Sequence, residues 1–125
     1  MEAAEALAEL AELSSQVEQA VVLRADGSVL AATPEGSPPE ALASAALELI
    51  AVAFELRSMP DEVTRVEVEL GEGGVFVLRD GGRTITARTS PGATPGLVVY
   101  DLRTCLHALE EAKPKRPPKS KEKGT

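Results

Sequence analysis

A chain of 125 residues and 13.1 kDa is long enough for one domain with a core of its own. Aromatic residues make up only 2% of it, which argues against a base-stacking platform and against an aromatic-lined cofactor pocket. The formal net charge of −7 disfavours nucleic acid as a partner, because an acidic surface repels phosphates.

The charge is divided between a domain at residues 1–112 and a tail at residues 113–125. The tail holds six basic residues and one acidic residue, a net +5, which leaves −12 on the domain. Because the tail is rich in Pro and Lys, we expect it to be disordered, either as a solubilising end or as a weak tether to an anionic surface. We find no apolar membrane span and no signal peptide, and therefore expect a cytoplasmic protein without stable membrane insertion.

The first element is predicted to be an amphipathic helix over residues 2–14. Its apolar side is formed by Leu7, Leu10 and Leu13 with Ala3 and Ala6. Residues 17–33 follow as a hairpin, in which the apolar run at 20–23 is typical of a strand covered on both faces. Residues 24–28 form its turn, where Gly27 after Asp26 supplies a left-handed residue.

Residues 38–59 are predicted to form the central helix of the fold. Ser37 can cap it, Pro38 suits the first helical position, and Glu40 completes a capping box. Met59-Pro60 marks its end, because the residue before a proline is pushed out of the helical region.

The central helix is too apolar for a surface helix of a monomer. Its few polar residues fall in one stripe about 80° wide, at 100° per residue: Glu40, Ser44, Glu48 and Glu55. Small residues border one side of the stripe (Ala41, Ala45 and Val52), and large ones border the other (Leu47, Ile50 and Phe54). Large apolar residues beside a solvated stripe indicate an interface, and a second copy of the helix would cover them. The alternative is that a nearby loop or the N-terminal helix covers this flank.

The second half of the chain changes to strand periodicity. Residues 64–70 alternate apolar and charged side chains, which predicts an edge strand with one wet face. Residues 75–78 are apolar on both faces, so this strand is expected nearer the middle. Residues 83–89 are predicted to form a further strand, because they are rich in β-branched residues. After a Pro/Gly loop at 90–96, residues 97–112 form the last helix. The helix turns Leu102, Leu106 and Leu109 toward the core.

The resulting order, α-β-β-α-β-β-β-α, resembles the Roadblock family, the dynein light-chain-like proteins whose bacterial members regulate small GTPases. Three stretches carry the resemblance: the hairpin VEQAVVLRADGSVLAAT, the second helix rich in small apolar residues, and the segment SPGATPGLVVYDLR that leads into the last helix. The resemblance implies an α+β fold with a five-stranded, mainly antiparallel sheet. The central helix then covers one face of the sheet and the two terminal helices the other.

The resemblance also implies a homodimer built from the central helix and the third strand. The predicted interface comprises Leu47, Ile50, Phe54, Arg65, Val66, Glu67 and Val68. Pairing of the third strand with its own copy is favoured when centred on Val66. Arg65 then faces Glu67 of the other copy, whereas centring on Glu67 opposes like charges.

We find no set of residues that supports an enzyme. Cys105 lies mid-helix among apolar residues, as an inert thiol would, and His107 is the only histidine. The phosphate-binding pattern GxxxxGK[ST] does not occur. Arg79, Arg83 and Arg88 lie around one predicted hairpin and are candidates for contact with a GTPase, although ion pairs within an acidic domain explain them as well.

The sequence therefore predicts a noncatalytic, homodimeric regulator of a small Ras-like GTPase, without a cofactor or metal. One alternative is a structural adaptor that has no effect on nucleotide turnover. A second is a sensor domain that holds a small ligand between sheet and helix, which the low aromatic content disfavours.

Overall fold

A computed structural model describes residues 2–56, 65–80 and 82–111 of the chain. Its elements are α1 (Ala3–Leu13), β1 (Val17–Leu23), β2 (Val29–Thr33), α2 (Glu40–Leu56), β3 (Arg65–Leu70), β4 (Gly73–Asp80), β5 (Arg83–Thr89) and α3 (Pro95–Glu111). This order confirms the predicted one. The expected end of the central helix at Met59-Pro60 and the expected tail at 113–125 lie outside the described residues.

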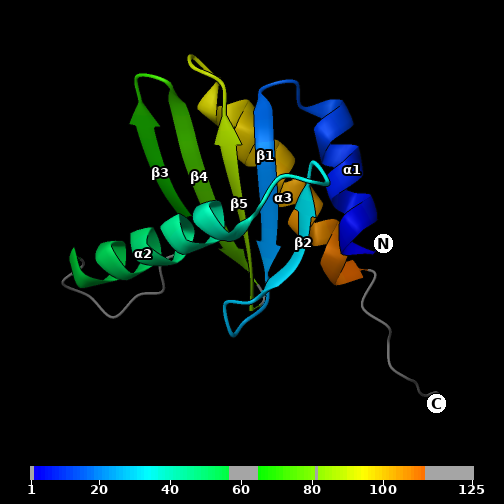
Figure 1. Cartoon of the computed structure of the whole chain (residues 1–125), viewed down its shortest axis with the longest axis horizontal. Coiled ribbons are helices and arrows are strands. Elements are labelled where there is room, and N and C mark those ends of the chain that lie inside the picture. The colour runs from blue at the N-terminus through cyan, green and yellow to red at the C-terminus, as the bar shows by residue number, and fades with distance from the viewer. Residues whose placement is uncertain (1, 57–64, 81, 112–125) are drawn as a thin grey trace.

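The five strands form one antiparallel sheet in the order β2-β1-β5-β4-β3. β3 is therefore an edge strand, as its alternating sequence predicts, and β4 and β5 are interior. Figure 1 shows α2 crossing one face of the sheet while α1 and α3 cover the other, which confirms the predicted α+β architecture. The C-terminal end of α2 reaches beyond β3, the edge of the sheet.

The main core lies between the sheet and the terminal helices. Its fully buried side chains include Leu7 of α1, Ile85 of β5, and Leu102 and Leu106 of α3. Leu109 is buried beside them, as predicted. Leu13 departs from the prediction, because it is 77% exposed at the last position of α1. Helical periodicity places Leu13 on the apolar side of α1, but it does not say how far along α1 the packing partner extends.

The core under α2 is thinner than the core under the terminal helices. Leu42 and Ala43, from the first half of α2, pack against Val21 and Leu23 of β1. Gln19 of β1 fixes the start of the helix, because its buried side-chain amide donates a hydrogen bond of 3.1 Å to the carbonyl oxygen of Pro38. The helix is thus anchored to the sheet at its N-terminal half.

Two helices begin at positions different from those predicted. α2 begins at Glu40 rather than Pro38, since Pro39 forces Pro38 into an extended conformation. The carbonyl of Pro39 accepts the first helical hydrogen bond, from Ala43, so Ser37 does not cap this helix. α3 begins at Pro95 rather than Leu97, in the first helical position that suits proline.

Candidate interaction site

The candidate site is the exposed side of α2 together with the neighbouring edge strand β3. Leu47, Val52 and Phe54 of α2 are 43%, 52% and 53% exposed, and Ile50 is half-buried. Exposed large apolar side chains are thus spread over more of the helix than the predicted flank, because Val52 belongs to the opposite border of the polar stripe. A helix with this much exposed apolar surface is typical of an interface.

Leu47 is partly covered by the chain itself. A Cβ atom built on Gly27 would lie 3.4 Å from Cδ1 of Leu47, so this side chain rests on the turn between β1 and β2. A nearby loop therefore covers part of Leu47, as the alternative to a second copy of the helix predicted for this side of α2. Beside it a hollow of about 180 Å³ opens between α2 and the two hairpin turns, lined by Leu47, Ile50, Arg24 and Arg79 among others.

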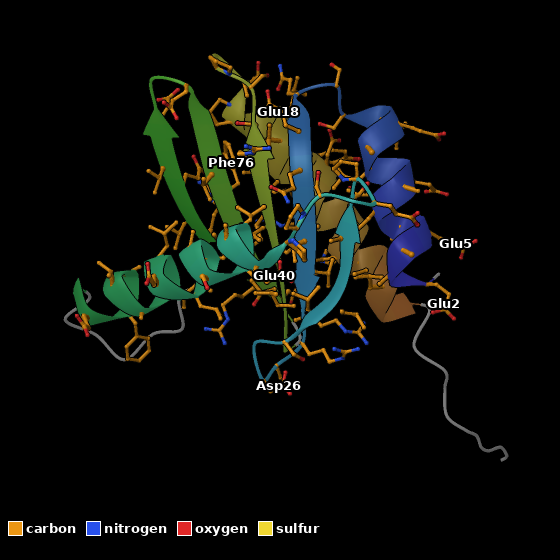
Figure 2. The ribbon with its side chains drawn as sticks, viewed as in Figure 1. Glu2, Glu5, Glu18, Asp26, Glu40 and Phe76 are labelled. Carbon is orange, nitrogen blue, oxygen red and sulfur yellow. The ribbon has the colours of Figure 1, made fainter. Side chains whose placement is uncertain are left out.

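The turn beneath Leu47 is held by its own polar side chains. The amide and the hydroxyl of Ser28 donate hydrogen bonds of 2.9 and 2.7 Å to Oδ1 of Asp26. Both bonds lower the pKa of Asp26 below its usual value, and the bond from the hydroxyl has the larger effect. Figure 2 shows Asp26 at the tip of the turn. These hydrogen bonds stabilise the turn on which the side chain of Leu47 lies.

β3 divides its predicted interface residues between the two faces of the sheet. Val66 and Val68 lie opposite Val77 and Val75 of β4, on the face that α2 covers, and both are half-buried. Arg65 and Glu67 lie on the other face. Nε of Arg65 is 2.9 Å from Oε2 of Glu67, an ion pair within one strand. A second copy at this edge would thus meet apolar residues on one face and charged residues on the other.

The structure brings only two of the three predicted arginines near one another. Arg79 and Arg83 flank the β4–β5 turn, but on opposite faces, since Arg79 pairs with Thr84. Arg88 lies at the far end of β5, about 16 Å along the strand, where Nε is 4.0 Å from Oε1 of Glu18. One ligand group cannot contact all three side chains, so contact of any of them with a GTPase stays a prediction for each arginine by itself.

The two residues considered for catalysis lie in different surroundings. Cys105 is 5% exposed in the core beside α1. Burial, and then the nearby charge of Glu9, raise the pKa of Cys105 from its usual 9.0 to about 11. His107 is exposed, with Nε2 3.3 Å from Oδ2 of Asp80. In the described part of the chain, no group of three or more His, Cys, Asp or Glu side chains is arranged to bind a metal.

Cys105 is expected to resist alkylation in the folded protein. With a pKa of about 11 rather than 9.0, its thiolate fraction at pH 8 is about 100-fold below that of an ordinary thiol. Iodoacetamide should therefore modify it about 100-fold more slowly than a free thiol, as followed by mass spectrometry. The same chain unfolded in urea provides the control and should react at the ordinary rate. Equal rates in the two states would contradict a buried, protonated thiol.

The raised pKa of Cys105 also sets a pH dependence of stability. The folded protein holds the thiol proton up to about pH 11, whereas the unfolded chain releases it near 9.0. The contribution of this group to stability is fully present below pH 9 and is lost as the pH rises from 9 to 11.

Some hydrogen bonds that hold distant parts of the fold together could not be predicted from the sequence. Gln16 accepts a hydrogen bond of 3.0 Å from the amide of Thr94 through its side chain, and its carbonyl accepts another from Ser90. These bonds tie the loop before α3 to the segment before β1. A local sequence pattern cannot predict a hydrogen bond to a residue 78 positions away. The hydrogen bond between Gln19 and Pro38 likewise joins residues that are distant in the sequence.

The comparison with known proteins agrees with this architecture. A family model described as the Roadblock/LC7 domain matches residues 3–87. No curated protein matches the chain by sequence. None of the helices in the described ranges is long and apolar enough to cross a membrane.

Three solved structures show how closely the fold is shared. A Roadblock/LC7 domain from Streptomyces avermitilis is 19% identical, with 89% of this chain and 97% of that chain covered and a TM-score of 0.75. The gliding protein MglB from Thermus thermophilus is 21% identical, with coverages of 88% and 90% and a TM-score of 0.71. A structure of MglB with a tetrameric arrangement is 21% identical, with coverages of 87% and 85% and a TM-score of 0.66.

Proposed function

The chain belongs to the Roadblock/LC7 domain family, and from this premise we propose that it is a noncatalytic homodimeric module that binds and regulates a small Ras-like GTPase. The partner is proposed because bacterial members of the Roadblock family regulate small GTPases. The observation that carries the dimer is the exposed apolar side of α2, with Phe54 53% exposed, next to β3, which has a neighbouring strand on one side only among the described residues.

In the proposed dimer, β3 pairs antiparallel with its own copy to extend the sheet across a two-fold axis. We place that axis at Val66, where Arg65 of each copy faces Glu67 of the other copy. The tetrameric arrangement of a similar MglB supports self-association as a property of this fold.

Oxidative cross-linking tests the position of the two-fold axis. Two copies of residue 66 paired across the axis would have Cα atoms about 5 Å apart, within disulfide range, so Val66→Cys should cross-link on oxidation. Val68→Cys is the matched control, because its two copies would be about 14 Å apart in this register. Cys105 is buried and does not compete. Preferential cross-linking of Val68→Cys, or of neither variant, would rule out an axis at Val66.

The proposed mechanism uses the GTPase's own catalytic residues. A module without a catalytic group can alter nucleotide hydrolysis by ordering the GTPase switch loops, which hold the attacking water. It can do so only when it binds one nucleotide state more tightly than the other. The broad surface formed by two copies of α2 and the joined sheets is the proposed contact.

Single replacement of Arg79, Arg83 or Arg88 by Ala is expected to have a small effect on hydrolysis. An arginine finger contributes 10³-fold or more, but Arg88 is already paired with Glu18 and the other two lie on opposite faces. Single-turnover GTP hydrolysis by the cognate GTPase, with each variant in excess, measures this. A loss of 10³-fold in any one variant would identify an arginine finger and end the noncatalytic assignment.

The two alternatives make different predictions about the same partner. An adaptor would bind the GDP and GTP states equally and leave turnover unchanged. A sensor needs a ligand pocket of about 300 Å³ or more, whereas four hollows on the surface of the described residues have volumes of about 160 to 260 Å³ each. Their size therefore favours a protein partner over a small ligand.

A further inference from the structure

A groove between α1 and α3 lies on the face of the molecule opposite α2 and has no role in the proposed dimer. Its volume is about 260 Å³. Its walls include Ala6, Leu10 and Leu13 of α1 and Tyr100, Thr104 and Ala108 of α3. From Ala6 to Leu13 it runs about 10 Å, or two helical turns. We call this surface the α1–α3 groove.

The α1–α3 groove exposes large apolar side chains that the fold does not use. Leu13 is 77% exposed and Tyr100 is 69% exposed, and both line the same hollow. Leu97, one turn before Tyr100 on α3, is 59% exposed. Leu13 and Tyr100 line the groove from opposite helices and form an exposed apolar patch that favours binding of an apolar partner surface.

The charged groups of the α1–α3 groove define what its partner must carry. Glu9 and Asp101 line it from opposite helices, and no basic side chain is among the lining residues of the described chain. Further along α1, Glu2 and Glu5 point away from the sheet, as Figure 2 shows. The apolar floor therefore lies between carboxylates, so that a partner with apolar residues flanked by Lys or Arg is complementary to it.

We propose that the α1–α3 groove binds a cationic amphipathic helix of a protein partner. Such a helix presents an apolar stripe at i, i+3, i+4 and i+7 that fits a two-turn apolar groove, with basic residues beside the stripe to meet Glu9 and Asp101. An anionic membrane is disfavoured by these same carboxylates. A second copy of the chain would bring an identical acidic groove, and like charges oppose that pairing.

The chain contains a built-in probe for this binding event. Tyr100 is its only tyrosine, and it has no tryptophan, so intrinsic fluorescence reports on the groove alone. The ligand is a 14-residue peptide of Leu at the stripe positions and Lys elsewhere, which adds no aromatic residue. We expect this peptide to change Tyr100 emission saturably, and to shift amide NMR signals of α1 and α3 in the full-length chain. A peptide with Glu in place of Lys should do neither.

Variants within and outside the groove separate groove binding from general attraction to an acidic protein. Leu13→Ser should weaken binding at least about 10-fold without loss of folding, because this side chain is largely exposed. Ala11→Ser, at an exposed position of α1 that does not line the groove, is the control and should leave the affinity unchanged. Combined Glu9→Gln and Asp101→Asn should weaken binding and reduce its salt dependence, whereas Glu48→Gln on α2 should not.

Several outcomes would overturn the proposal. These are no saturable binding, equal binding of the Glu peptide, NMR shifts confined to α2 and β3, or unchanged affinity in Leu13→Ser. If the added peptide instead displaces residues 113–125, so that their NMR signals change as those of a released segment would, the chain's own tail is the occupant. Leu13-dependent sedimentation with phosphatidylserine vesicles would name a membrane, and a Leu13-dependent oligomeric state would name a second copy.

Discussion

Phe54→Glu is expected to convert a dimer of about 26 kDa, twice the 13.1 kDa chain, into a monomer. Phe54 is 53% exposed close to the C-terminal end of α2, and this end of the helix reaches past β3 (Figure 1), so in the proposed dimer it is covered by the other copy. A carboxylate there would have to be buried without a partner, at a cost of several kcal/mol. Light scattering at low micromolar concentration measures the mass, and circular dichroism should show helix content close to that of the wild type.

Ser44→Glu is the matched control for this change. It adds the same charge to the same helix, but within the polar stripe, and the dimer should persist. Leu47→Glu should also dissociate the dimer, with some added loss of stability, because Leu47 rests on the turn at Gly27 as well. A wild-type chain that is monomeric at the outset would remove the role proposed for α2.

Gly73→Ala is expected to lower the free energy of unfolding by about 3 kcal/mol, a large part of the stability of a domain of this size. Gly73 begins β4 with a φ of +148°, which side-chain-bearing residues rarely adopt, and an added Cβ would overlap the carbonyl oxygen of Thr89 on β5. The strand must then shift against its neighbour. Urea unfolding followed by circular dichroism gives the midpoint and the free energy.

Gly71→Ala provides the comparison, because it lies in the same β3–β4 connection with open space around its Cβ and no positive φ. Its stability should stay within about 0.5 kcal/mol of the wild type. If both variants unfold at the wild-type midpoint, close packing at Gly73 is not what fixes the start of β4.

Much of the fold follows from local patterns in the sequence. Clean alternation of apolar and charged residues identified the edge strand β3, and continuous apolar runs identified the strands covered on both faces, β1 and β4. The misplaced features depend on neighbours instead. The start of α2 is shifted by a second proline, and the exposure of Leu13 depends on how far the packing partner of α1 extends.

The candidate site was predicted less completely than the fold. The apolar flank of α2 could be found from helical angles alone, and Phe54 is exposed as that pattern requires. The separation of Arg88 from Arg79 follows from hairpin register, which brings Arg88 opposite Val75 at the far end of the strand. Pairing of the site with a second copy or a GTPase stays a prediction, because it depends on a surface that one chain does not contain.

The most direct test of the proposed function is a calorimetric titration of the purified protein with a small Ras-like GTPase encoded in the same genome. The GTPase is loaded in parallel with GDP and with a nonhydrolysable GTP analogue. The proposed function predicts that one nucleotide state binds clearly more tightly than the other, because only differential affinity can shift the switch loops. Equal affinity for both states would contradict regulation and favour an adaptor. Absence of binding to any encoded GTPase would remove both the partner and the mechanism.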